Sequence, residues 1–164
     1  MKAKIFCLFL FCVCCQLNIH AQKNYNVIRN NQNQLLTYEE LEELWEPAFS
    51  ALIQKIDKNN PVDLNEDIIL NFVKKRKNFL SINLSSRSLD KGTLSKEGIN
   101  HIEELLESSL LGEIRNGLFS LDQFNMTNKE WIRFYKRKNL QIQLLLKDKQ
   151  GTPITFVTVI TSHL

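Results

Sequence analysis

Hydrophobic residues recur at helical spacing directly after residue 36. Thr37 and Glu40 form a capping box there, and an apolar stripe continues from Leu41 to Ile56. This pattern predicts a helix that begins at Thr37 and buries one of its faces. Pro47 interrupts the stripe without shifting its phase, so we expect the helix to kink or restart at that point.

Two later segments carry equally clear helix signals. Residues 95 to 115 place their apolar side chains on one broad face, and the Asn-Gly pair at 116 and 117 is a natural stop, so a long helix is predicted there. A capping box of Thr127 and Glu130 predicts a shorter helix through Tyr135.

One more helix is predicted over residues 63 to 80. Asp63 and Glu66 have the spacing of a helix start. The segment would then bury a set of apolar residues at mostly helical spacing, namely Ile68, Ile69, Phe72, Val73, Phe79 and Leu80.

The pattern changes near the C-terminus from helical spacing to alternation. Residues 140 to 146 alternate apolar and polar side chains, residues 154 to 161 are rich in β-branched ones, and the segment between them supplies turn residues. The two segments therefore predict a β-hairpin. A lone hairpin is only marginally stable, so further strands are expected, with 81 to 85 and 118 to 124 as candidates.

The second strand of this hairpin has an unusual composition. Residues 154 to 160 include no charged residue and no proline. A strand of this kind aggregates when its edge is bare. We therefore expect the segment to be covered, paired internally or paired with a partner.

Together these elements indicate an α+β fold, with three to four helices packed on a small antiparallel sheet that ends in a C-terminal β-hairpin. The order of helix, helix, short strand, long helix and strands also resembles the nuclear-transport-factor-2-like cone, in which a curved sheet wraps a long helix. That resemblance implies an alternative architecture with an enclosed pocket.

The N-terminal residues have the layout of a secretory signal peptide. Lys2 and Lys4 precede an apolar run from residue 5 to 15, and Ala21 closes a short polar stretch. This layout predicts cleavage after Ala21, which makes the protein secreted or periplasmic. The run is shorter than the about 20 apolar residues of a membrane-spanning helix, and no later segment comes closer, so no integral membrane segment is expected.

The cleavage would divide the chain into a signal peptide at 1–21, a flexible Asn/Gln-rich arm at 22–36 and a single α+β domain at 37–164. All four cysteines would be removed with the signal peptide, which excludes disulfides and thiolate sites. Loss of Lys2 and Lys4 from the 21 basic residues leaves 19 against 18 acidic ones, a formal net charge of +1. Nucleic acid is therefore not an expected partner.

Few residues of the mature chain suggest a metal or catalytic site. Glu97, His101 and Glu104 approach one another on the long helix, but they lie opposite its apolar face, as charged surface residues do. The sequence contains no glycine-rich phosphate loop and no G-x-S-x-G motif. We therefore predict no metal site, no cofactor and no catalytic residue.

One cluster of basic and aromatic residues is a candidate binding site. Trp131, Arg133, Tyr135 and Arg137 combine cations with rings that suit an anionic or sugar-like ligand. In the alternative, the aromatic rings belong to the core and the charges are solvated. A further alternative pairs this cluster and the basic run 74 to 77 with the acidic first helix, within one chain or across a dimer.

The leading functional hypothesis is a small exported soluble domain that acts by binding a protein partner or a small ligand, not by catalysis. The alternative is an enzyme with a cone-shaped pocket that uses carboxylate, tyrosine or histidine side chains as acid and base. A pocket with a carboxylate of raised pKa would favour the enzyme. A homodimer joined through the sheet edge or through oppositely charged faces is a third hypothesis.

Overall fold

The computed structural model describes most of the predicted domain from Leu36 onward. The predicted signal peptide at 1–21 and the rest of the predicted arm at 22–36 lie outside the described residues. The described residues are 36–118, 120–121, 124 and 126–164.

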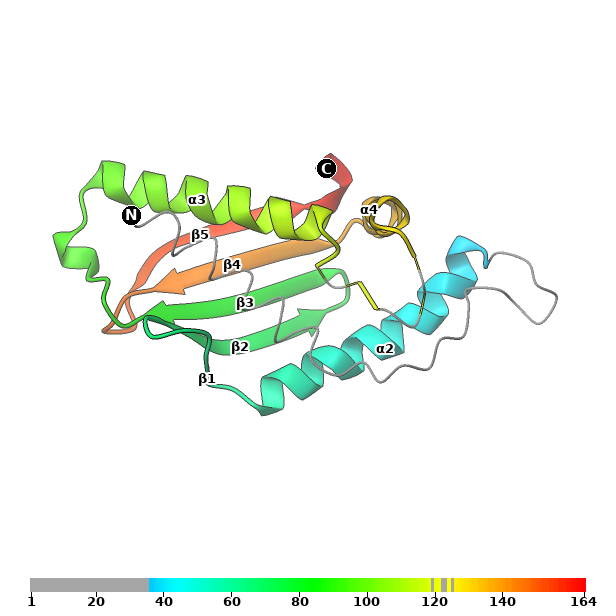
Figure 1. The fold of residues 1–164 in the computed structure, drawn as a ribbon, viewed down its shortest axis with the longest axis horizontal. Helices are drawn as coiled ribbons and strands as arrows, with labels where there is room; N and C mark the ends of the chain where they lie inside the picture. The colour runs from blue at the N-terminus through cyan, green and yellow to red at the C-terminus, as the bar shows by residue number, and fades with distance from the viewer. Residues whose placement is uncertain (1–35, 119, 122–123, 125) are drawn as a thin grey trace.

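A five-stranded mixed sheet forms the centre of the fold (Figure 1). Its strands lie side by side in chain order, and each neighbouring pair is antiparallel except the third and fourth strands, which are parallel. The strands are β1 (Val62–Asp63), β2 (Ile68–Arg76), β3 (Phe79–Ser86), β4 (Gln141–Lys147) and β5 (Pro153–Ile160).

The three helices that were predicted from capping and stop signals are confirmed. In the first, the Thr37 hydroxyl accepts the Glu40 N–H at 3.2 Å, and the Glu40 carboxylate accepts the Thr37 N–H at 2.7 Å. Pro47 lies within this helix, which continues past it without a restart. The helices are α2 (Tyr38–Lys58), α3 (Lys96–Arg115) and α4 (Asn128–Lys138), with short 3₁₀ turns η1 (Lys91–Thr93) and η3 (Thr161–His163).

The predicted α+β class and the C-terminal hairpin of β4 and β5 are confirmed. One correction concerns strand direction, because the sheet is mixed and not antiparallel throughout. The connection from β3 to β4 contains α3 and α4 and returns the chain to the end of the sheet where β3 began. Such a crossover is what a parallel pair of strands requires.

The helix predicted over residues 63 to 80 is wrong, because β1, β2 and the start of β3 occupy this segment. A β-bulge at Asn71 shifts the register between Leu70 and Phe72. The extra residue breaks the two-residue alternation of the strand and places apolar residues at spacings that imitate a helix. The strand ends at a turn in which Lys77 has a φ of 51°.

The two candidate strands have different outcomes. Residues 81 to 85 form the middle of β3, whereas the described residues of 118 to 124 lie in no strand. Because strands replace the predicted second helix, the order of elements also differs from the one on which the resemblance to the nuclear-transport-factor-2-like cone was based.

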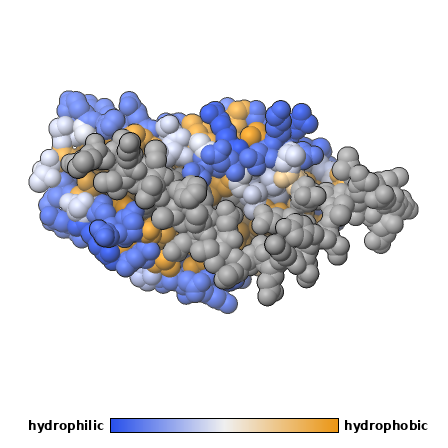
Figure 2. All heavy atoms as spheres, in the orientation of Figure 1, coloured by the Kyte–Doolittle hydropathy of each residue, from blue (hydrophilic) through white to orange (hydrophobic). Residues whose placement is uncertain are grey.

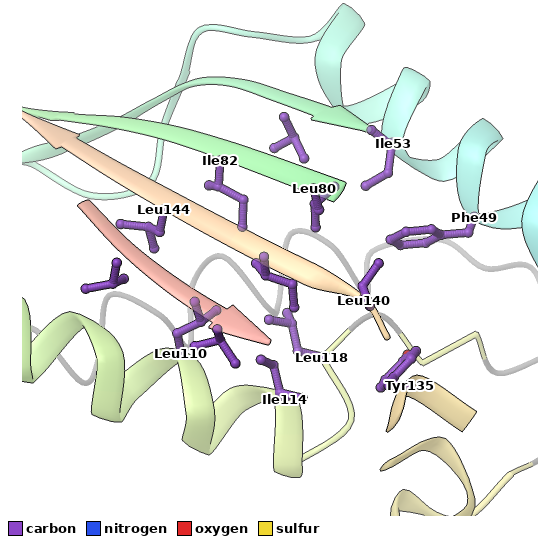
Figure 3. Packing of buried hydrophobic residues seen from close by; sticks show 14 of the residues in the cluster. Phe49, Ile53, Leu80, Ile82, Leu110, Ile114, Leu118, Tyr135, Leu140 and Leu144 are labelled. Carbon is purple, nitrogen blue, oxygen red and sulfur yellow. The ribbon is translucent and has the colours of Figure 1, made fainter. Parts of the chain in front are cut away.

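Helices α2 and α3 pack on the same face of the sheet, here called the inner face. α2 lies along β2, where Glu46 pairs with Lys75, and α3 lies along β5, where Thr155 donates to the Glu103 carboxylate at 2.9 Å. Figure 3 shows inner-face residues of β3 and β4 close to residues of both helices. Apolar residues of four strands are buried on this face: Leu70, Val73, Leu80, Ile82, Leu84, Ile142, Leu144, Leu146, Val157 and Val159.

Polar side chains surround this apolar layer on the helical side. Figure 2 shows mostly hydrophilic residues around α4, with hydrophobic residues visible toward the middle of the molecule. Within the described part of the chain, no helix has an apolar stretch long enough to cross a membrane.

Candidate binding surface

The second face of the sheet, here called the outer face, carries the side chains that point away from α2 and α3. Neighbouring side chains of a strand alternate between the two faces, so the strand register assigns each residue to one of them. The outer face comprises Ile69, Phe72, Lys74, Arg76, Phe79, Ser81, Asn83, Ser85, Gln141, Gln143, Leu145, Lys147, Phe156, Thr158 and Ile160.

The centre of the outer face is a row of residues that crosses four strands. Phe72 lies beside Asn83, Asn83 beside Leu145, and Leu145 beside Phe156. Phe156 is 60% exposed and is one of two large hydrophobic residues that are classed as exposed in the described chain, the other being Leu44 on α2 at 52%. Asn83 therefore lies between two apolar side chains, those of Phe72 and Leu145, and the Phe156 ring at the end of the row is open to solvent.

Hydrogen bonds fix the polar part of this row. The amide of Asn71, the residue in the bulge of β2, donates to Asn83 Oδ1 at 2.9 Å and to Ser85 Oγ at 3.2 Å. Asn83 is only 2% exposed. The bulge therefore positions a side chain that satisfies the buried asparagine and leaves the neighbouring Phe72 on the outer face.

The charges of the outer face have one sign. Lys74, Arg76 and Lys147 lie on it, and none of its fifteen residues, as defined above, is an aspartate or glutamate. Lys74 Nζ lies 5.0 Å from the centroid of the Phe72 ring, so a cation adjoins the apolar row. The surface combines an apolar row, hydroxyl and amide groups around it, and basic residues at its margins.

Lys75 of the basic run 74 to 77 and Lys138 at the end of α4 are both paired with α2. Lys75 on the inner face forms an ion pair with Glu46, and Lys138 of α4 forms ion pairs with Glu42 and Glu46. Both lysine side chains are 7% exposed, so the glutamates neutralise charges that are otherwise costly to bury. For these residues, the pairing with the acidic first helix that the sequence suggested is present within one chain.

These contacts shift the ionisation of both partners. Burial raises the pKa of Glu46, but the hydrogen bonds and charges of Lys75 and Lys138 outweigh it, and the pKa lies below its ordinary value. Burial lowers the pKa of Lys138, but its hydrogen bonds to Glu42 and Glu46 outweigh that effect and raise the pKa. Each group is therefore held in its charged form at neutral pH.

The four residues of the sequence-predicted site do not share one surface. Trp131 and Tyr135 are buried, with their rings stacked at a centroid distance of 5.5 Å. Arg133 is exposed. Arg137 is exposed and pairs with Glu39 at 2.7 Å, with its guanidinium 4.0 Å from the centroid of the Tyr38 ring.

The aromatic cluster around Tyr135 joins α4 to α2. The Trp45 ring lies edge-on to those of Phe134 and Tyr135, and stacks on Phe49 at a centroid distance of 4.4 Å. Such contacts make the rings part of the core. The Tyr135 hydroxyl has no hydrogen-bond partner in the described part of the chain, and burial raises its pKa well above the ordinary value. Ligand binding by the predicted four residues stays a prediction.

Four carboxyl groups of the described chain have a lowered pKa, namely those of Glu46, Glu97, Glu130 and Asp148. In the described chain, each carboxyl group with a clear shift has a lowered pKa, and backbone N–H groups or lysines stabilise the charged form in each case. No three histidine, cysteine, aspartate or glutamate side chains among the described residues are gathered as metal ligands.

The outer face was not foreseen from the sequence. Phe72 was assigned to the buried side of a helix that does not exist, and Leu145 lies in an apolar run whose outward residue cannot be recognised without the register. The sequence held one sign of this surface, the uncharged strand at residues 154 to 160. Its composition predicted that the strand is covered by other residues or paired with a partner.

No protein-family model and no curated protein matches the chain. Two solved structures are similar to it at 14% sequence identity. One is a candidate secreted protein from Pseudomonas aeruginosa, with a TM-score of 0.44 over 74% of this chain and 93% of that chain. The other is the pilotin EpsS of the type 2 secretion system of Vibrio vulnificus, with a TM-score of 0.47 over 76% of this chain and 94% of that chain. Likeness at this level does not establish a shared function.

Proposed function

We propose that this chain is an exported, non-catalytic domain that binds a protein partner through the outer face of its sheet. The observation that carries the proposal is the row of Phe72, Leu145 and Phe156, with its exposed ring, on a face toward which neither α2 nor α3 packs. Exposed aromatic and aliphatic clusters with a polar rim are typical of protein interfaces.

The dimensions of the face favour a protein over a small molecule. From β2 to β5 the strands cover three spacings of about 4.8 Å, and seven strand residues extend about 23 Å. Small ligands bind in concave sites that enclose most of their surface, whereas a sheet face of this extent offers a broad contact area. A protein surface with apolar side chains at its centre is the occupant that fits.

The charges of the face specify the partner further. Lys74, Arg76 and Lys147 would lie at the margin of the contact, with no acidic residue of the outer face beside them. A partner with aspartate or glutamate around an apolar centre would be attracted to this surface and oriented on it. Association should therefore slow as salt concentration rises.

The proposed location is the periplasm or the exterior of the cell. It rests on the predicted signal peptide, whose basic start, apolar run and small residue at Ala21 are the features that export signals share. The partner would then be another protein of the cell envelope or of the exterior.

In-cell photo-crosslinking tests the contact directly. The photoreactive residue benzoylphenylalanine would replace Phe156 in the full chain, and in a second strain it would replace Leu44, the matched exposed residue on α2. We expect a crosslinked adduct with a different protein from position 156 and none from position 44. The adducts would be identified by mass spectrometry.

A second measurement would use the identified partner in purified form. The substitution Phe156→Ser should raise the Kd at least 10-fold, whereas Leu44→Ser should leave it unchanged, because central interface aromatics contribute most of the binding energy. Three outcomes would refute the proposal. They are equal adducts from both positions, no adduct with another protein from position 156, and equal Kd values for the two variants.

A further inference from the structure

The two edges of the sheet differ in how they are protected from pairing. Native sheets protect an edge by making the strand short or by placing proline and charged residues on it. β1 has only two residues, follows Pro61, and carries Asp63 in an ion pair with Arg87 at 2.6 Å. The β1 edge therefore has three of these protections.

The β5 edge has little protection of this kind. β5 is eight residues long, its one proline is its first residue, and none of its residues is charged. The start of the strand is occupied, since the Pro153 carbonyl accepts a hydrogen bond from Lys91 Nζ at 2.6 Å. No strand in the described part of the chain pairs with the remaining length on the side opposite β4.

The backbone groups that face this free edge can be assigned from the register. Thr161 N–H donates to the Leu140 carbonyl at 2.9 Å, so Thr161 points its backbone groups toward β4. Backbone direction alternates along an antiparallel strand. The N–H and C=O groups of Phe156, Thr158 and Ile160 therefore point away from β4, toward the free edge.

We infer that two copies of this chain pair through their β5 edges, antiparallel to each other, to form a homodimer with one continuous sheet. This inference goes beyond the proposed function, because the contact lies at the edge of the sheet and needs no other protein. Each copy offers the same three residues, as a two-fold symmetric contact requires.

A register centred on Thr158 satisfies the free backbone groups on both sides. Thr158 then lies opposite Thr158 of the second copy, and Phe156 lies opposite Ile160. All three residues that face the edge form hydrogen-bonded pairs, in which opposite residues exchange both N–H···O bonds. The side-chain pairs are also favourable, since threonine pairs with threonine and an aromatic ring with a β-branched residue.

The charge distribution permits the approach of two identical edges. β5 is uncharged, and two basic residues of the outer face, Lys74 and Arg76, lie on β2, three strands away. The third, Lys147, lies on β4 beside Pro153, at the start of β5 and five residues from Thr158. If two copies instead packed their outer faces against each other, these like charges would be brought close together. Edge pairing therefore suits a second copy better than face pairing.

The mass in solution and a matched pair of variants test the inference. We expect the full chain, measured by light scattering at tens of micromolar, to have twice the monomer mass. Thr158→Lys would place two ammonium groups opposite each other at the centre of the contact and raise the dimer Kd at least 10-fold. The control is Gln143→Lys, which adds the same charge on the same face one strand inward, beside Thr158.

Cysteine crosslinking gives an independent measurement that does not depend on a destabilising charge. Opposite Cα atoms in a hydrogen-bonded antiparallel pair lie about 5.5 Å apart, within the range that a disulfide can span. Oxidised Thr158→Cys should therefore form a covalent dimer, whereas Gln143→Cys and the unsubstituted chain, which controls for the native cysteines, should not.

Three results would overturn the inference. The first is a monomer mass for the unsubstituted chain at all concentrations up to about 100 μM. The second is a dimer that Gln143→Lys disrupts as strongly as Thr158→Lys, which would place the contact on the outer face. The third is failure of Thr158→Cys to crosslink. The first and third results leave the proposed contact of the outer face with a different protein untouched, because that contact is measured separately by crosslinking from position 156.

Discussion

Two buried lysines depend on one glutamate at the junction of α2, α4 and the sheet. Glu46 contacts both Lys75 and Lys138, and Glu42 provides a second partner for Lys138 alone. An unpaired buried charge is costly, whereas the attraction between the paired charges offsets much of that cost. Ionised Glu46 therefore links α2 to both β2 and α4 through these two lysines.

We predict that Glu46→Gln lowers the free energy of unfolding by about 1–2 kcal/mol at pH 7, the range for a partly exposed hydrogen bond to a charged group. The folded-state pKa of Glu46 is lowered, so its contribution is present above the unfolded pKa of about 4.3 and is lost as the pH falls through the folded pKa. Urea unfolding at pH 7 and pH 3 should show the difference between variant and parent shrinking at the lower pH.

Glu43→Gln is the control for this experiment, since Glu43 is an exposed residue of the same helix. It should change the free energy of unfolding by less than about 0.5 kcal/mol. A loss from Glu46→Gln that was equally large at both pH values would show that ionisation of Glu46 is not its source.

At the residue scale, the helix caps could be predicted from the sequence, whereas the burial of individual aromatic side chains could not. The capping residues Thr37 and Thr127 act within four residues of chain, so their roles followed from spacing alone. Whether Trp131 and Tyr135 face a ligand or a core depends on α2, which is distant in the sequence. Their chemistry suits both roles, and only the packing of α4 on α2 places them.

At the scale of elements, α2, α3 and α4 were predicted correctly because each has its own start or stop signal in the sequence. The end of α3 shows how such a stop works. Asn116 is its C-cap, and Gly117 follows with a φ of +93°. A left-handed φ is strained for residues with a side chain, and a Cβ at Gly117 would also lie 2.9 Å from Asn128 Oδ1.

Gly117→Ala and Gly112→Ala should therefore have opposite effects. Gly112 lies inside α3, where an added Cβ would meet nothing within 4 Å, so alanine should raise the free energy of unfolding by about 0.5–1 kcal/mol. Gly117→Ala should lower it by about 1–3 kcal/mol. Thermal or urea unfolding would measure both, and a stabilising Gly117→Ala would show that the stop at the end of α3 is not strained.

The error in β2 shows why strands were harder to predict. The bulge at Asn71 changes the phase of alternation within a nine-residue strand. A local reading of Ile68, Ile69, Phe72 and Val73 then finds helical spacing, although a neighbouring strand imposes the real register. Regular alternation in β4 carried no such interruption, and that strand was predicted correctly.

At the scale of the whole molecule, the parallel pairing of β3 with β4 could not be predicted from local pattern. It depends on where the chain lies after α3 and α4, and on which strand β4 then meets. The register of that pairing in turn decides which residues of β4 share the outer face, which is why the candidate surface emerged only from the sheet. The α+β class followed from the number and kind of elements alone.

The processing of the whole chain leads to the last prediction. All four cysteines lie in residues 7 to 15, within the predicted signal peptide. Protein isolated after export should therefore begin at Gln22 and gain no mass when it is denatured and treated with iodoacetamide. Reductant should likewise leave its thermal midpoint unchanged, because the remaining residues hold no disulfide. Intact-mass spectrometry distinguishes the alternatives: alkylation at one or more cysteines would place the cleavage before residue 15 or show that none occurs.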